Sequence, residues 1–109
     1  NLNVIRKVNE PIHWQKITPE KKITLQRVLQ EFLINTKKHS EATVVIIDFS
    51  EDRKNISVTY TDNGIGLKNT QQRKSGLQNA ENRILAVKGN ITFDNTIQKG
   101  FKVTVVIPK

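Results

Sequence analysis

The chain has 109 residues, with 18 Lys and Arg against 10 Asp and Glu, so its formal net charge is +8. This length supports a single domain over residues 1–109 with one hydrophobic core, and the absence of cysteine excludes a disulfide framework, a thiolate metal site and a cysteine nucleophile. No apolar run approaches the roughly 18 residues of a membrane span. The first residue is Asn1 rather than Met, which suggests a piece excised from a longer protein, whose membrane anchor, if it has one, would lie outside this chain.

The first two predicted elements are a strand and a helix. Alternation of Leu2, Val4 and Val8 predicts an edge strand. Thr18-Pro19 then supplies an N-cap and a first-turn proline. Apolar residues follow at helical spacing and predict one amphipathic helix over residues 19–39, with the stripe Leu25, Val28, Leu29, Phe32 and Leu33.

The remaining elements alternate strand pairs with one more helix. Residues 43–49 and 56–61 read as an antiparallel hairpin, and 63–75 as a polar loop that bears glycines. Ser75 with Gln78 resembles a capping box that opens a helix, which Lys88-Gly89 ends. Two strands near 90–94 and 101–107 complete an α+β fold: a two-layer α/β sandwich with helices on one face of a mixed, mainly antiparallel sheet.

Three polar clusters could carry chemistry, and the first lies on the long helix. Glu31, Asn35 and Lys38 are spaced i, i+4 and i+7, which places them on one strip of a helix, and His39 follows. Such a strip could hold a hydrated Mg²⁺ through the amide oxygen and neutralise phosphate through the ammonium group. It could equally be a solvated face whose cations complement the helix dipole.

The second cluster is Asp62-Asn63-Gly64-Ile65-Gly66, directly after a predicted strand. A carboxylate there could accept a hydrogen bond from the exocyclic amine of adenine and disfavour guanine, which has a carbonyl oxygen at that position. The glycines would let a loop fold over the ligand. The alternative is a hairpin-type turn, for which Asp-Asn-Gly is well suited.

The third cluster is Ser75-Gly76-Leu77 at the expected start of the second helix. Backbone N–H groups at a helix N-terminus favour phosphate, and glycine lets an anion approach. Plain helix capping is the alternative. All five glycines lie in the second half of the chain, and this uneven placement suggests a site that depends on the backbone.

The three clusters together closely resemble the ATP-binding catalytic domain of two-component sensor histidine kinases, within the gyrase, Hsp90, histidine kinase and MutL ATPase superfamily. Glu31 to His39 matches the N box of that family, Asp62 to Gly66 its first glycine box, and Gly76 with Leu77 its second. The resemblance spans roughly residues 18–108. It implies a Bergerat-type sandwich that binds ATP and Mg²⁺ between the first helix and a lid.

The resemblance also implies roles for single residues. Asn35 would coordinate Mg²⁺, Lys38 and His39 would meet phosphate, Asp62 would recognise adenine, and Glu31 would be the catalytic base or polariser. The ATP-binding residues carried over in this way are Asn35, Lys38, His39, Asp62, Gly64, Ile65, Gly66, Lys74, Ser75, Gly76 and Leu77.

Two departures from the family pattern concern glycine-rich positions. Lys74 stands where a second glycine box often has its first glycine, so it would stiffen the lid or contact phosphate. Phe101 follows Gly100, where family members often have Thr supporting a water near adenine.

The resemblance implies a histidine autokinase that works in the cytoplasm as part of a homodimeric parent. The γ-phosphoryl group of ATP would pass to a histidine on a separate dimerisation domain of the same protein, with a response regulator downstream. Neither His13 nor His39 has the setting of an acceptor, so we expect this chain alone not to autophosphorylate.

The sequence leaves two alternative functions open. An anti-sigma-factor-type serine kinase of the same superfamily would use the same site. A non-enzymatic basic module would use the positive surface, but one Trp, one Tyr and four Phe with no recognised motif argue against a nucleic-acid partner.

Overall fold

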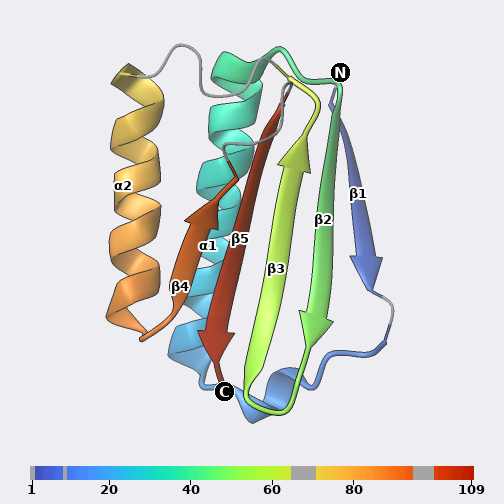
Figure 1. Cartoon of the computed structure of the whole chain (residues 1–109), viewed down its shortest axis with the longest axis vertical. Helices are drawn as coiled ribbons and strands as arrows, with labels where there is room; N and C mark the ends of the chain where they lie inside the picture. Colours follow the sequence, from blue (N-terminus) through green and yellow to red (C-terminus); the bar gives the residue numbers. More distant parts are fainter. Residues whose placement is uncertain (1, 9, 65–70, 95–99) are drawn as a thin grey trace.

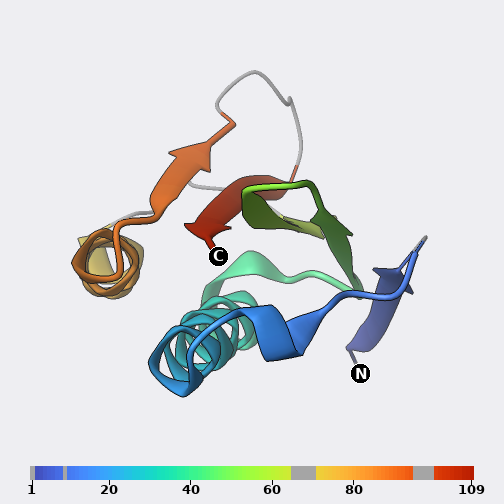
Figure 2. The same ribbon diagram turned by 90° about the horizontal axis from the view of Figure 1, so that it is seen from below.

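The computed structural model describes residues 2–8, 10–64, 71–94 and 100–109. One five-stranded sheet has the order β1-β2-β3-β5-β4, and both helices, α1 and α2, cover the same face of it (Figures 1 and 2). Strand β1 pairs in parallel with β2, and the other neighbours are antiparallel. The strands are β1 (Asn3–Val8), β2 (Val44–Glu51), β3 (Asn55–Asp62), β4 (Asn90–Phe93) and β5 (Phe101–Pro108). The predicted α+β sandwich is therefore confirmed.

Helix α1 (Pro19–Asn35) begins as the sequence predicts. The Thr18 side chain accepts a hydrogen bond from the Lys21 backbone N–H at 3.4 Å, and Pro19 occupies the first turn. After Asn35 the chain continues as a π-helical segment, η2 (Thr36–Ser40). The α-helical spacing of 100° per residue, on which the predicted strip depends, therefore does not extend to Lys38.

The core lies between the helices and the sheet. Inward-facing residues alternate along the central strands, and both β3 and β5 are buried at every second position. The buried stripe of β3 is Ile56, Val58, Tyr60 and Asp62, so its last member is a carboxylate. The buried face of α1 likewise ends in polar residues, Asn35 and Thr36.

Helix α2 (Gln71–Ala86) corrects one prediction. It begins at Gln71, so Ser75 and Gly76 lie in its second turn and the expected capping box at Ser75 is wrong. The predicted end is confirmed by a Schellman motif: Gly89 N–H donates to the Ile84 carbonyl at 2.9 Å, and Lys88 N–H to the Leu85 carbonyl at 3.0 Å. Lys88 has φ 65°, so it supplies the left-handed residue of this motif.

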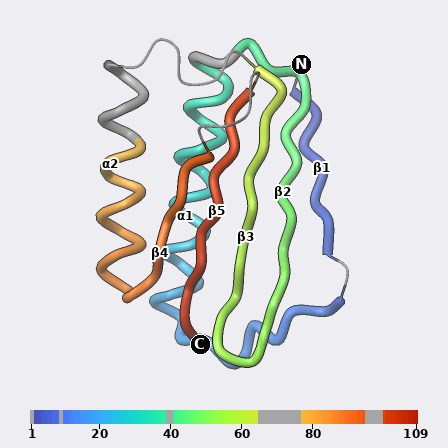
Figure 3. Tube along the Cα trace, viewed as in Figure 1, coloured from blue at the N-terminus to red at the C-terminus, as the bar shows by residue number. Residues whose placement is uncertain are grey.

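Several helices and strands begin or end at the same end of the sheet, the upper end in Figures 1 and 3. The carboxyl ends of α1 and β3 lie there beside the starts of β2 and β5, and α2 begins at the same end. This convergence brings the polar ends of two buried stripes together. Within the described ranges, no helix is both long enough and apolar enough to span a membrane.

Candidate functional site

Asp62 is the centre of the polar cluster at this end of the sheet. It is the last residue of β3, and only 3% of its surface is exposed. Its position facing the helices follows from strand alternation, because Tyr60 and Val58 on the same face are core residues. A buried carboxylate needs hydrogen-bond donors, and this one has them from two directions.

One donor comes from the end of the long helix. The Thr36 hydroxyl donates to Asp62 Oδ2 at 3.0 Å, and Thr36 Oγ1 also lies 2.6 Å from Tyr60 Oη. Thr36 is four residues after Phe32, so it continues the buried face of α1 toward the sheet. Helix and strand are thus joined through three side chains that are each at least 97% buried, with exposed fractions of 1%, 0% and 3%.

The other donor comes from the chain just after β3. Gly64 N–H donates to Asp62 Oδ1 at 2.9 Å, which closes an Asx turn. Asn63 accepts from the backbone N–H groups of Thr43 and Val44 at 2.9 and 3.0 Å, so it ties the end of β3 to the start of β2. The hairpin alternative for this motif is wrong, because β3 pairs with β2 and β5 and the next described element is α2.

Gly100 holds the start of β5 against the same residue. Its φ is +94°, and a Cβ built on it would lie 2.2 Å from the Asp62 carbonyl oxygen. The next residue, Phe101, pairs with Asp62 in the β3–β5 register and is 3% exposed. Its ring contacts those of Phe32, Tyr60 and Phe93, which form the apolar floor beneath the cluster.

Asn35 brings an amide to this end of the helix. It is 9% exposed, and no hydrogen bond to its side chain is found within the described residues. Glu31, one turn earlier, is half-buried, while Lys38 on η2 is exposed. An amide oxygen one helical turn after the Glu31 carboxylate offers the hard oxygen ligands that Mg²⁺ prefers. Mg²⁺ keeps most of its coordination for water and phosphate, so a cage of three or more carboxylates or imidazoles is not required. The described part of the chain contains no such cage.

The other predicted ligand contacts fall largely outside what the structure describes. Ile65 and Gly66 lie outside the described residues, as do the side chains of His39, Lys74 and Ser75. Gly76 is within α2, whose first turn, the part of a helix that offers backbone N–H groups to an anion, begins at Gln71. Leu77 is 9% exposed and belongs to the core cluster, so packing already accounts for it.

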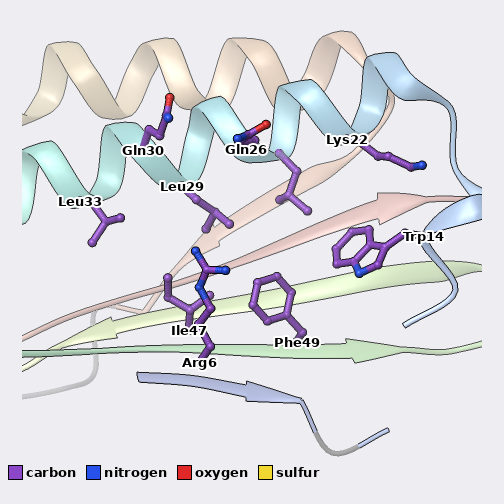
Figure 4. A pocket seen from close by; sticks show the side chains of 10 residues that line it. Arg6, Trp14, Lys22, Gln26, Leu29, Gln30, Leu33, Ile47 and Phe49 are labelled. Carbon is purple, nitrogen blue, oxygen red and sulfur yellow. The ribbon is translucent and has the colours of Figure 1, made fainter. Parts of the chain in front are cut away.

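A groove lies away from these residues, between α1 and the β1–β2 side of the sheet (Figure 4). It has a volume of about 480 Å³ and is mainly apolar, with Trp14, Leu29 and Phe49 among its walls. Arg6 and Lys22 add positive charge at its rim. None of the predicted site residues lines it.

Sequence reasoning missed Thr36, Tyr60 and the role of Gly100. A signal existed for Thr36, because it lies four residues after Phe32 and eight after Val28 on the predicted apolar stripe. A hydroxyl at such a position needs a polar partner across the core. For Gly100 only the backbone approach reveals the reason for glycine.

Residues 20–109 match the family model described as histidine kinase-, DNA gyrase B-, and HSP90-like ATPase. The sensor histidine kinase ComP of Bacillus subtilis (strain 168) is 36% identical over 92 residues, which cover 81% of this chain and 12% of ComP. The signal transduction histidine-protein kinase/phosphatase DegS of Brevibacillus brevis is 31% identical over 88 residues, which cover 79% of this chain and 23% of DegS. The chain thus spans less than a quarter of the length of these two relatives.

The fold agrees with a solved histidine kinase structure. The histidine kinase domain from the Erythrobacter litoralis EL346 blue-light activated histidine kinase superposes with a TM-score of 0.77 at 16% identity, covering 98% of this chain and 51% of that chain. At this identity the likeness supports the Bergerat-type fold alone. With a family match over residues 20–109 and curated relatives that are sensor kinases, the chain belongs to the histidine kinase-, DNA gyrase B- and HSP90-like ATPase family.

Proposed function

We propose that this chain binds Mg²⁺-ATP and supplies its γ-phosphoryl group to a histidine on a separate dimerisation domain of the same protein. The observation that carries the nucleotide part is the buried Asp62 carboxylate at the end of β3, which accepts hydrogen bonds from Thr36 and Gly64. The kinase part rests on the family match and on relatives that are sensor histidine kinases.

Adenine fits Asp62 better than guanine does. Each carboxylate oxygen can accept two hydrogen bonds, so the contacts from Thr36 and Gly64 do not by themselves exclude a further donor. The exocyclic amine of adenine is such a donor. Guanine would set a carbonyl oxygen against the carboxylate, and two opposed acceptors in a buried site are costly.

The phosphates would extend from adenine toward the end of α1. Asn35 would hold Mg²⁺ through its amide oxygen, Lys38 and His39 would meet phosphate, and Glu31 would polarise the attacking group. When bound, Mg²⁺ neutralises negative charge on the phosphates as the γ-phosphoryl group leaves. Gly64, Ile65 and Gly66 would belong to a lid that closes over ATP, and residues 74–77 would contact its phosphates.

The acceptor histidine is assigned to another domain. His13 is not suited to the role because it lies far from the proposed nucleotide site: its Nδ1 is 2.7 Å from Oε1 of Glu51, the last residue of β2, at the end of the sheet opposite to Asp62. The proposal therefore requires a dimerisation domain in a homodimeric parent, with a response regulator as the next phosphate acceptor. It places the domain in the cytoplasm, where ATP is available.

Titration of this chain with Mg²⁺-ATP, Mg²⁺-GTP and a short DNA duplex in parallel tests the class of function. ATP should bind, GTP should bind at least about tenfold more weakly because of the opposed acceptors, and the duplex should show no saturable binding at physiological salt. Saturable binding of the duplex without any response to ATP would favour the basic binding module instead.

A further inference from the structure

The Thr36 hydroxyl lies between the Asp62 carboxylate, which the proposed function assigns to adenine, and the Tyr60 hydroxyl, which has no assigned role. Its hydroxyl oxygen lies 3.0 Å from Asp62 Oδ2, the proposed adenine contact, and 2.6 Å from Tyr60 Oη, which belongs to the core. Thr36 and Tyr60 are 1% and 0% exposed. The three groups therefore interact with little competition from solvent, and the direction of each hydrogen bond matters.

The direction follows from counting hydrogens. A threonine hydroxyl has one proton, and Thr36 donates it to Asp62. The short contact to Tyr60 can then be made only if the tyrosine hydroxyl donates to Thr36 Oγ1. The chain of hydrogen bonds runs from Tyr60 through Thr36 to Asp62.

The Tyr60 hydroxyl is held in place by its ring. That ring packs against Phe32, with centroids 5.3 Å apart, and against Phe101 at 6.2 Å. It is also fixed by the alternation of β3, which places Tyr60 and Asp62 on the same face of the strand. Core packing therefore holds the Tyr60 hydroxyl in position to donate to Thr36 Oγ1, which a freely rotating hydroxyl at the surface would not do reliably.

We propose that Thr36 is a positioning residue that keeps Asp62 a hydrogen-bond acceptor and thereby sets the preference for a purine with an exocyclic amine. Thr36 on one oxygen and Gly64 N–H on the other both point a hydrogen at the carboxylate. Both contacts use the carboxylate oxygens as acceptors, which is also the role that the exocyclic amine of adenine requires of them. This inference rests on the proposed function, because it needs Asp62 to meet the base.

The test compares two ligands that differ only at the amine. Parent, Thr36→Val and Thr36→Ser are titrated with Mg²⁺-ATP and with the triphosphate of purine riboside, which lacks the 6-amino group. Valine keeps the shape of threonine without the hydroxyl, and serine restores the hydroxyl. We expect Thr36→Val to lose roughly tenfold or more in ATP affinity and to bind the analogue within about twofold of the parent, as befits loss of a hydrogen bond to a charged group. Thr36→Ser should regain the parent's preference for ATP.

Two further variants keep the test decisive. Tyr60→Phe retains the ring and removes the donor to Thr36, so it should lower the ATP-to-analogue ratio in the same direction even if Thr36→Val does not fold. Thr59→Val makes the same chemical change as Thr36→Val on the opposite face of β3, where Thr59 contacts Thr104 at 3.4 Å, and should leave the ratio unchanged.

The outcomes separate this inference from the proposed function. If the parent prefers ATP over the analogue but Thr36→Val and Tyr60→Phe keep the same ratio, Thr36 has no positioning role while the nucleotide site stands. Should the parent bind neither ligand, the proposed function fails and this inference falls with it.

Discussion

Gly100 shows how closely the backbone approaches Asp62. Its φ of +94° is a conformation that residues with a Cβ rarely adopt, and the space for a Cβ is taken by the Asp62 carbonyl oxygen. A side chain here would push β5 away from β3 at the position where Phe101 pairs with Asp62. The glycine therefore supports both the sheet and the carboxylate.

Gly100→Ala should lower the free energy of unfolding by roughly 2 kcal/mol or more, from the positive φ together with the backbone clash. ATP affinity, measured by calorimetry at a temperature where the variant is folded, should fall as well because Asp62 shifts.

Gly89→Ala is the matched control. A Cβ there would lie 2.6 Å from the Val106 carbonyl oxygen, at the turn between α2 and β4, so this variant should also lose stability. It should nevertheless keep the parent's ATP affinity. Equal ATP affinity for Gly100→Ala and Gly89→Ala would contradict a special role for Gly100 at the site.

At the scale of elements, Glu51 joins three parts of the chain at the end of the sheet away from Asp62. It closes β2, accepts from His13 Nδ1 at 2.7 Å just before η1 (Trp14–Lys16), and pairs with Lys109 Nζ at 2.7 Å beyond β5. The hydrogen bond from Lys109, followed by that from His13, lowers the pKa of Glu51 from 4.5 to about 2. The segment that leads into α1 is thus fastened to the sheet.

This lowered pKa predicts a pH dependence of stability. Because the Glu51 pKa is lower in the folded than in the unfolded chain, its contribution is fully present above about pH 4.5 and is lost as pH falls toward about 2. The difference in unfolding free energy between parent and Glu51→Gln should therefore shrink over that range. Urea unfolding at several pH values measures it, and a constant difference from pH 5 to pH 2 would contradict the contacts described for Glu51.

The two helices differ in how well the sequence predicts them. The start of α1 was predictable because Thr18-Pro19 stands directly before a strong apolar stripe. The start of α2 was not, because residues 71–74 are polar and have no apolar period, which leaves the capping pattern at Ser75 as the nearest signal in the sequence. The π-helical turn at Thr36–Ser40 likewise has no signal in residue type.

At the scale of the whole molecule, the fold class followed from the order of strands and helices, and the candidate site from motifs near their ends. Asp62 was predictable because a carboxylate followed by two nearby glycines ends a clearly alternating strand. Its contacts with Thr36 and Gly100 were less so, since these residues lie 26 and 38 residues from Asp62 in the chain. Such contacts depend on how α1 and β5 register against β3.

The central claim is that Asp62 is the acceptor for the adenine of ATP, and calorimetric titration of Asp62→Asn with Mg²⁺-ATP tests it most directly. The matched control is Asp52→Asn, because Asp52 accepts from Lys54 and Asn55 N–H groups in the β2–β3 turn, at the opposite end of the sheet. The account predicts that Asp62→Asn keeps its secondary structure by circular dichroism but shows no measurable ATP binding, while Asp52→Asn binds like the parent. A folded Asp62→Asn that binds ATP as tightly as the parent would contradict it.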